Sequence, residues 1–195
     1  IGSVSYIKGF GVRELGKPEM VEENTLFAVA SNSKAFTGLS IAMLENEGKL
    51  KLDDKVSMYI PEIKMYDPVA TDLLTIKDVL THRVGIGTFQ GDFITWGTNY
   101  TESELINKLQ YFKPIYGFRS GYGYFNTGYT VAGEIIKRIT GKEWAKYVKE
   151  NILNPLNMNR TLTSVSQLNQ SDNTAVPHTF NYEYKMVPLP WRNVD

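Results

Sequence analysis

The chain has 195 residues, enough for one large domain or a domain and a half. Its 21 basic and 21 acidic residues cancel, which gives no support for a nucleic-acid partner, and no apolar run approaches the roughly 20 residues that a membrane-spanning helix needs. With no cysteine and two histidines far apart in sequence, disulfides and thiol nucleophiles are excluded, and we expect no metal and no cofactor.

The first predicted elements are two strands and a helix. Residues 3–15 alternate loosely between apolar and polar and predict a strand, while 25–30 predict a short apolar strand or extended segment. Over 33–46 apolar residues recur at helical spacing, and Gly48 is a stop signal. Residues 49–63 indicate an exposed connection.

Further helices are predicted downstream. The segments 75–78 and 101–104 each place an acidic residue three positions after a threonine, the spacing of a capping box at a helix start. Residues 130–140 and 142–153 predict two amphipathic helices separated by Thr140 and Gly141, and the glycine- and tyrosine-rich stretch before them predicts an irregular loop. This order favours an α+β fold over a regular βαβ alternation.

A candidate nucleophile lies where the first helix begins. Ser31 and Lys34 fit the pattern S-x-x-K, and residues three apart on a helical turn share a face. The other match, Ser5 and Lys8, lies in the predicted first strand, where side chains three apart point to opposite faces. Serine is a poor nucleophile until a neighbour takes its proton, and an ordinary lysine is already protonated. Burial and the positive end of the helix dipole would both favour the neutral amine.

The alternative interpretation of this turn is structural. Ser31 or Ser33 can cap the helix, with Lys34 solvated. The apolar flanks "LFAVA" and "AFTGLSIAML" favour an enclosed turn instead. If the turn is a site, the backbone N–H of Ser31 is an expected oxyanion donor, because a helix start leaves N–H groups without intrahelical partners.

A second candidate element precedes a later helix. Tyr124 and Asn126 form the sole Y-x-N in the chain. A phenol can relay a proton, and an amide can both donate to and accept from a substrate amide. The structural alternative is that the ring of Tyr124 packs and Asn126 caps the following helix.

Together these stretches resemble the serine β-lactamase and penicillin-binding-protein superfamily, for which S-x-x-K is a recognised motif. The branch they resemble contains class C β-lactamases, D-Ala-D-Ala carboxypeptidases, D-aminopeptidases and related esterases. The resemblance covers 9–15, 25–63, 74–86 and 124–158, with Val84 where a small hydroxyl residue is more usual. Matching order and spacing make it more specific than either short motif.

The resemblance implies a role for each candidate residue. Ser31 would be the nucleophile and form an acyl-enzyme, and Lys34 would assist its deprotonation. Tyr124 would exchange protons with Ser31 and the leaving group. Asn126 would hold the substrate amide or orient Lys34. Which of Lys34 and Tyr124 is the main base stays open, since the pair can titrate as one unit.

One expected motif is missing. The family has a late-strand motif, K-S/T-G or H-x-G, which supplies the second oxyanion N–H. "HTF" at His178 lacks the glycine, and "TGK" at Thr140 has the wrong order. We therefore expect an N-terminal portion of the fold with an incomplete sheet: strands and nucleophile helix over 1–50, a helical subdomain over 51–160, and a loop-rich segment leading back to the missing sheet over 161–195.

The resemblance implies a β-lactamase/transpeptidase-like α+β fold, with an antiparallel sheet flanked by helices plus a helical subdomain. It implies a serine acyl hydrolase acting on a D-amino-acid peptide, β-lactam or ester in the periplasm or outside the cell. A complementary C-terminal fragment is a conceivable partner besides the small-molecule or peptide substrate, and the oligomeric state stays open. Loss of one oxyanion donor typically costs about 10²–10³ in rate, so we expect little activity from these residues alone.

Two alternatives are weighed against this function. One is a non-catalytic binding or scaffold relative of the same fold, favoured by the missing motif. The other is a generic helical interaction domain whose Ser–Lys pair is a coincidence. Among the remaining residues, His82 is expected to form a structural hydrogen bond near a helix end and His178 to lie in a loop. Trp96 is expected to fill the core or border the cleft. The other tyrosines near Tyr124 are expected to pack or line a pocket: Tyr116, Tyr122 and Tyr129.

Overall fold

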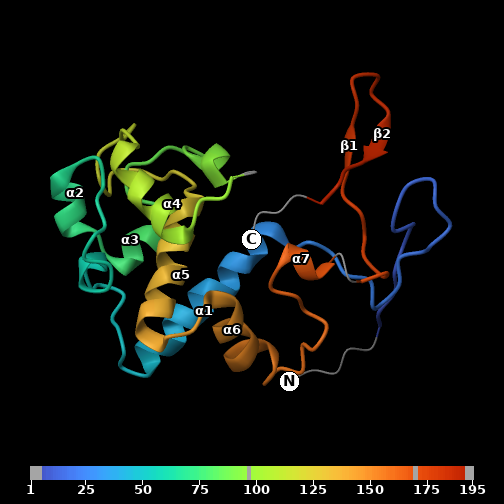
Figure 1. Ribbon diagram of the computed structural model, residues 1–195, viewed down its shortest axis with the longest axis horizontal. Coiled ribbons are helices and arrows are strands. Elements are labelled where there is room, and N and C mark those ends of the chain that lie inside the picture. The colour runs from blue at the N-terminus through green and yellow to red at the C-terminus, as the bar shows by residue number, and fades with distance from the viewer. Residues whose placement is uncertain (1–5, 96–97, 169–170, 192–195) are drawn as a thin grey trace. The chain divides into compact units, whose positions relative to one another are not determined.

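The computed structural model forms two compact units (Figure 1). One unit combines Ile1–Ala30 with Met158–Asp195, and the other is Ser31–Asn157. The division predicted at residues 50 and 160 stays a prediction. The structure describes three stretches of the chain: residues 6–95, 98–168 and 171–191.

The unit Ser31–Asn157 is helical. Its α-helices are α1 (Ser33–Asn46), α2 (Pro68–Leu73), α3 (Ile76–Leu80), α4 (Glu102–Lys108), α5 (Asn126–Thr140) and α6 (Trp144–Val148). Short 3-10 turns are η1 (Ala30–Asn32), which begins one residue before the unit, η2 (Val56–Met58), η3 (Asp92–Thr95) and η4 (Leu109–Tyr111), and a π-helical turn η5 (Lys149–Leu153) continues α6.

Helix α1 confirms the helix predicted over 33–46. It ends before Gly48, whose φ of 70° is left-handed and therefore suits glycine. Its buried positions follow the three- and four-residue spacing of one helical face: Thr37, Ser40, Ile41 and Leu44. The sequence also predicts Leu39 on the apolar face, with Phe36, Ile41, Met43 and Leu44. That prediction is wrong for Leu39, which falls between the buried positions and is 46% exposed.

Both predicted capping boxes are present. At the start of α3, Asp78 N–H donates to Thr75 Oγ1 over 3.2 Å, and Thr75 N–H donates to Asp78 Oδ2 over 3.0 Å. At the start of α4, Glu104 N–H donates to Thr101 Oγ1 over 3.3 Å, and Thr101 N–H donates to Glu104 Oε2 over 2.8 Å. Each box satisfies N–H groups that lack intrahelical partners, which is why the sequence spacing located both helix starts.

Asp78 also anchors a loop distant in sequence. Its carboxylate is fully buried and accepts hydrogen bonds from Arg83 Nε at 2.6 Å and Arg119 Nη2 at 2.7 Å. Burial alone would raise the pKa of Asp78, but the hydrogen bonds from Arg119, Thr75 and Arg83 together lower it. The carboxylate therefore stays charged and holds residue 119 against the start of α3.

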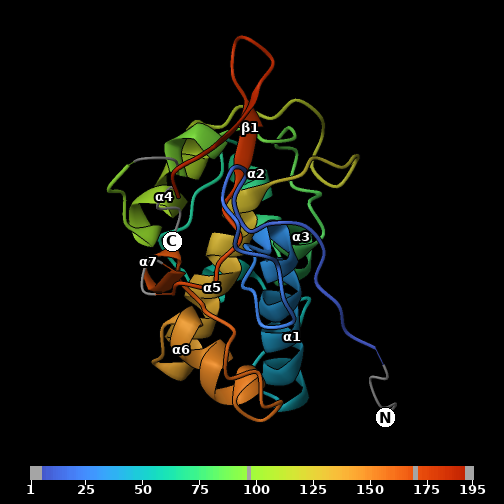
Figure 2. The ribbon, with the colours of Figure 1, turned by 90° about the vertical axis from the view of Figure 1, so that its right-hand side faces the viewer.

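Helix α5 is the centre of this unit. It contacts α1, α3, α4 and α6, and Figure 2 shows it running beside α1. Its buried face includes Val131, Ala132, Ile135 and Ile136, all fully buried. The helix ends at Gly141, which has a left-handed φ of 69°, so the predicted break between two amphipathic helices is confirmed.

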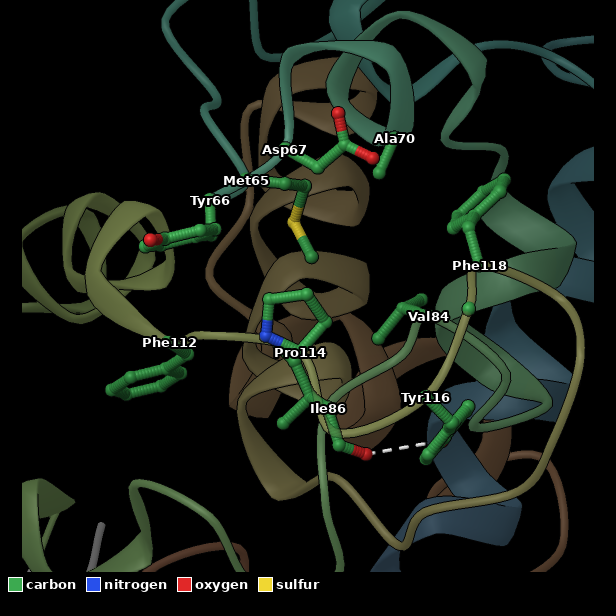
Figure 3. Close-up of a pocket in the computed structure, with 11 residues that line it drawn as sticks. Met65, Tyr66, Asp67, Ala70, Val84, Ile86, Phe112, Pro114, Tyr116 and Phe118 are labelled. Atoms are coloured by element: carbon green, nitrogen blue, oxygen red, sulfur yellow. Dashed lines mark hydrogen bonds between the residues drawn. The ribbon is translucent and has the colours of Figure 1, made fainter.

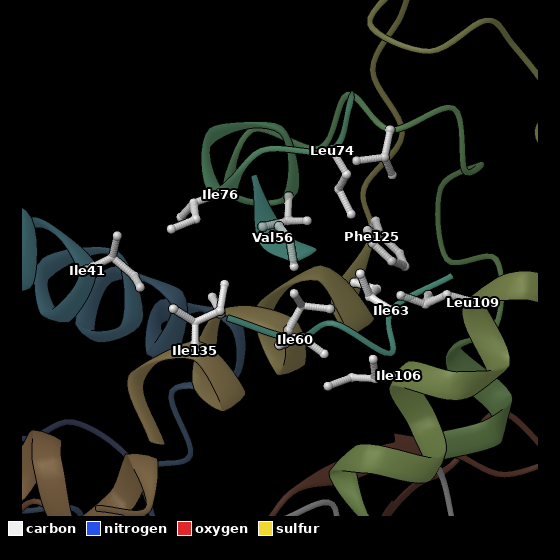
Figure 4. Packing of buried hydrophobic residues seen from close by; sticks show 14 of the residues in the cluster. Ile41, Val56, Ile60, Ile63, Leu74, Ile76, Ile106, Leu109, Phe125 and Ile135 are labelled. Atoms are coloured by element: carbon white, nitrogen blue, oxygen red, sulfur yellow. The ribbon is translucent and has the colours of Figure 1, made fainter. Parts of the chain in front are cut away.

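The core fills the space between these helices and the connection after α1 (Figure 4). Ile41 of α1, Ile106 of α4 and Ile135 of α5 project into it. The prediction that 49–63 is an exposed connection is wrong. Its turns direct four apolar side chains inward, those of Leu50, Val56, Ile60 and Ile63.

The other unit holds the strands. β1 (His178–Phe180) and β2 (Met186–Pro188) form an antiparallel hairpin with Thr179 opposite Val187, and α7 (Val165–Leu168) precedes it. The sequence analysis did not predict this hairpin. His178 therefore begins a strand, contrary to its expected place in a loop. The turn is organised by Asn181, whose Oδ1 accepts hydrogen bonds from Glu183 N–H and Lys185 N–H.

The strand predicted over 3–15 is wrong within the described residues 6–15. The pairing there is one isolated bridge, between Val12 and Met20. Residues 25–30 likewise form one bridge, from Leu26 to Thr174, and Ala30 already belongs to η1, so the predicted strand is not formed. Alternating residues become a strand when a neighbouring strand takes up their N–H and C=O groups, and the described part of this unit offers little pairing. Across the described stretches no helix has the length and apolar character to cross a membrane.

Candidate active site

The local backbone brings Ser31 and Lys34 onto one side of a helix start. Ser31 lies in the 3-10 turn η1, directly before α1, and Lys34 lies in the first turn of α1. The preceding residue, Ala30, has a φ of 43°, a left-handed conformation that is uncommon for a residue with a Cβ atom. Such strained positions cluster at functional sites, which makes this turn a candidate site on backbone grounds alone.

The amine of Lys34 lies at the centre of the cluster. Its Nζ donates to Ser31 Oγ over 3.2 Å and to Asn126 Oδ1 over 2.6 Å. It also lies 4.8 Å from the ring centroid of Tyr124 and 5.2 Å from that of Tyr129. The face of an aromatic ring attracts a cation, so the two rings and the two hydrogen bonds together hold the amine of Lys34 in one place. The structure thus brings together Ser31 and Lys34, as the motif predicts.

Tyr124 completes the contacts of Ser31. Its hydroxyl donates to Ser31 Oγ over 2.5 Å. Burial would raise the pKa of the Tyr124 phenol, but the amine of Lys34 and the hydroxyl of Ser31 lower it further than burial raises it. Ser31 is an exposed residue, and its Oγ has two groups within proton-transfer distance.

The segment that carries Tyr124 is fixed on both sides. The backbone N–H of Tyr124 donates to Thr88 Oγ1 over 3.1 Å, and the Tyr124 carbonyl accepts from Phe89 N–H at 2.9 Å. The next side chain, Phe125, is 1% exposed in the core. The preceding residue, Gly123, runs so close to Ile86 that a Cβ on Gly123 would lie 2.0 Å from the Ile86 carbonyl oxygen. These hydrogen bonds and close packing contacts therefore set the position of the phenol.

His82 supports this segment. It is buried two residues after α3, and its Nδ1 accepts a hydrogen bond from Phe125 N–H at 3.0 Å, which is the structural hydrogen bond expected near a helix end. Its ring centroid lies 4.7 Å from that of Tyr124. Burial and the positive charge of Lys34 lower the pKa of His82. Because Nδ1 accepts this hydrogen bond, the neutral imidazole supports the segment of Tyr124.

Asn126 reaches a residue that the sequence analysis missed. Its Nδ2 donates to Asp92 Oδ2 over 2.6 Å. Asp92 begins the 3-10 turn η3, 34 residues before Asn126, and no local motif connects the two. The other expectation in this region, for Trp96, lies outside the described residues. Tyr122 is 66% exposed.

A small pocket elsewhere in this unit is distinct from the cluster. It has a volume of about 70 Å³ and is lined mainly by apolar side chains, among them Met65, Val84, Phe112 and Phe118, together with Tyr116 (Figure 3). Small-molecule sites usually measure about 300–1,000 Å³, so this pocket is a packing gap. Within the described ranges no three His, Cys, Asp or Glu side chains gather closely enough to hold a metal ion.

The chain as a whole is similar to known proteins. The family model described as "Beta-lactamase" matches residues 2–194. "Protein flp" of Staphylococcus aureus (strain NCTC 8325 / PS 47) is 32% identical over 200 residues, covering 99% of this chain and 39% of that protein. The chain therefore spans about two fifths of the length of this curated relative.

Solved structures show the same fold. The octameric penicillin-binding protein homologue from Pyrococcus abyssi is 30% identical with a TM-score of 0.81, covering 96% of this chain and 44% of that one. A class C beta-lactamase, at 24% identity, shares the fold with a TM-score of 0.72 over 95% of this chain and 48% of its own. These likenesses confirm the expected β-lactamase/transpeptidase-like fold, of which this chain forms a part. With the family model matching almost every residue, the chain belongs to the Beta-lactamase family.

Proposed function

We propose that Ser31 is the nucleophile of a serine acyl hydrolase. The observation that carries this proposal is the position of Ser31 Oγ, within hydrogen-bond distance of both Lys34 Nζ and Tyr124 OH. A serine next to a proton acceptor that is itself held by further contacts is the general arrangement of an activated nucleophile. Lys34 is held by Asn126, and Tyr124 by the chain around Thr88 and Phe89.

The proposed reaction has two halves. Ser31 Oγ attacks a substrate carbonyl while its proton passes to the Lys34–Tyr124 pair, and a tetrahedral oxyanion forms. The bond to the leaving group then breaks, and the pair returns the proton to that group, which leaves an ester on Ser31. A water molecule attacks the ester by the same route, giving the acid and free Ser31. Because the two groups contact the same oxygen, they act as one coupled unit.

Charge on the developing oxyanion needs N–H donors. We propose the backbone N–H of Ser31 as one of them, because it lies in the turn where α1 begins. No second donor is assigned among the described residues. Since the chain spans about two fifths of a curated relative, the proposed activity belongs to the full-length polypeptide.

For the substrate we propose an acyl compound: a D-amino-acid peptide, a β-lactam or an ester. The family match and the likeness to a penicillin-binding protein homologue support this class. Asn126 has its amide oxygen on Lys34 and one amide hydrogen on Asp92, which supports its role in orienting Lys34.

Intact-mass measurement of the full-length protein tests the proposal. After incubation with a penicillin or a fluorophosphonate, we expect one adduct with at least one probe, located on Ser31 by peptide mapping. Ser31→Ala should remove the adduct. Ser33→Ala, two positions along the same turn, is the matched control and should keep it. No adduct with either probe, or an adduct that survives Ser31→Ala, would contradict the proposal.

A further inference from the structure

We propose that Asp92 is a positioning residue of this site. It fixes the side-chain amide of Asn126 in one orientation, so that the amide oxygen holds the amine of Lys34 beside Ser31. This inference rests on the proposed function of Ser31.

The chemistry of the three groups allows one arrangement. The amine of Lys34 donates, so the oxygen of the Asn126 amide must face it, and the distance there is 2.6 Å. The carboxylate of Asp92 accepts, so the amide NH₂ must face it, also at 2.6 Å. A rotation of the amide by half a turn would place two donors together and two acceptors together. Asp92 therefore selects the orientation that Lys34 needs.

The loop that carries Asp92 is fastened to the segment of Tyr124. Phe89 N–H donates to the Tyr124 carbonyl at 2.9 Å, and Asp92 N–H donates to the Phe89 carbonyl at 3.1 Å. Gln90 ties the same loop to residue 113, where its Nε2 donates to the Lys113 carbonyl over 3.0 Å. The carboxylate and the phenol thus share one rigid support, which is what a positioning role requires.

The surroundings of the second carboxylate oxygen of Asp92 indicate that fold stability alone does not account for an aspartate at this position. Oδ1 is buried and accepts no hydrogen bond within the part of the chain that the structure describes. A buried polar atom without a partner destabilises a fold, and native proteins leave few of them. An apolar residue at position 92 would avoid this destabilisation, but it would leave the NH₂ of Asn126 without its acceptor. A role in orienting Asn126 accounts for a carboxylate at this position.

The experiment compares acylation of the full-length protein and its variants. The acylation rate constant and the probe dissociation constant are measured separately, with whichever of the penicillin and the fluorophosphonate labels the wild type. We expect Asp92→Ala to slow acylation by roughly 10- to 100-fold, the loss of one charge-assisted hydrogen bond, with the dissociation constant changed less than twofold. Asp92→Asn keeps an acceptor oxygen and the shape of the side chain, so it should fold and recover most of the rate.

A matched control and a double mutant separate positioning from general destabilisation. Asp54 also accepts two hydrogen bonds, from Lys51 N–H and Tyr59 OH, both at 2.7 Å and away from this cluster. Asp54→Ala should lower the melting temperature and leave the acylation rate unchanged. If Asp92 acts through Asn126, Asp92→Ala should cause no further loss in an Asn126→Ala background.

Two results would overturn the inference. One is wild-type acylation by Asp92→Ala and Asp92→Asn while Ser31 is still labelled, in which case the proposed function stands and the role of Asp92 falls. The other is a double variant, Asp92→Ala with Asn126→Ala, whose loss of acylation rate is the full combination of the two single losses. Absence of any Ser31 adduct in the wild type would reject the proposed function, and the role of Asp92 with it.

Discussion

At the scale of single residues, the surroundings of Tyr124 alter the acid–base chemistry of its phenol. Its hydroxyl lies 2.5 Å from Ser31 Oγ, and its ring lies beside the amine of Lys34. Burial opposes ionisation of the phenol, yet Lys34 and Ser31 lower its pKa below the ordinary 10.0. The phenolate, which accepts a proton, is therefore present at a lower pH than for an ordinary tyrosine.

This shift predicts a pH dependence of acylation. If Tyr124 takes the proton of Ser31, the acylation rate should rise with pH as the phenol ionises. Because the pKa of Tyr124 is lowered, this rise should be centred below pH 10.0. Tyr124→Phe should remove that rise and slow acylation by roughly 10²–10⁴-fold, the usual contribution of general acid–base catalysis. Tyr122→Phe, a neighbouring exposed tyrosine, is the control and should keep the wild-type profile. A profile unchanged by Tyr124→Phe would leave Lys34 as the base.

Of the five residues in the candidate site, local sequence patterns identified four and missed Asp92. Ser31 and Lys34 are three positions apart, and Tyr124 and Asn126 two apart, so each pair is a local pattern. Asp92 meets Asn126 across 34 positions, and a single aspartate in a loop carries no local signal. That contact exists because the loop and the Tyr124 segment pack together.

At the scale of elements, the segment of Tyr124 lies against the chain around Ile86 with no room for a side chain. Gly123 N–H donates to the His82 carbonyl over 3.0 Å, and a Cβ at this position would lie 2.0 Å from the Ile86 carbonyl oxygen. Both neighbours are backbone atoms, which cannot move aside as a flexible side chain can. The same close approach sets the position of Tyr124 relative to Ser31.

Gly123→Ala should therefore destabilise the protein and disturb the site. We expect a loss of about 1–3 kcal/mol in the free energy of unfolding, the usual cost of overpacking, measured by chemical denaturation. Gly38→Ala in α1 is the control, because no atom lies within 4 Å of its added Cβ. Alanine in a helix interior should stabilise by about 0.5–1 kcal/mol. Equal effects of the two substitutions would contradict the packing argument.

Elements with local signals were predicted well, and those without were not. The capping boxes at Thr75 and Thr101 locate helix starts because both partners lie within four residues. The strand over 3–15 failed in its described part, because pairing depends on a partner that is distant in sequence. In 49–63, turns bury apolar side chains such as Val56 and Ile60 between exposed polar residues, and the polar composition suggested an exposed connection.

At the scale of the whole molecule, burial is divided unequally between the two units. The fully or nearly buried apolar residues of the described chain lie in Ser31–Asn157, with the exception of Leu168. In the other unit many large apolar side chains are exposed, among them Tyr6, Phe10, Phe27, Phe180, Tyr182 and Tyr184. Hydrophobic burial is the main stabilising term in folding, so local stability should differ between the units.

Hydrogen exchange of the 195-residue chain measures this difference. We expect amides of α1 and α5 to exchange slowly, because these helices surround the core. Amides of the hairpin β1–β2 should exchange faster, because it is a two-stranded sheet whose residues are at least partly exposed. The comparison is made on peptides from both units in one experiment. Equal protection in the hairpin and in α5 would show that exposure does not set local stability here.

The sequence by itself determined the family, the helices that begin and end with local capping signals, and the pairs Ser31–Lys34 and Tyr124–Asn126. These are properties of neighbours along the chain, whose geometry follows from helical turns and short spacings. The tertiary structure alone decided that Tyr124 meets Ser31 Oγ and that Asp92 contacts Asn126. It also decided that apolar side chains of 49–63 are buried. Contacts between distant segments depend on how whole elements pack, and no short stretch of residues encodes that packing.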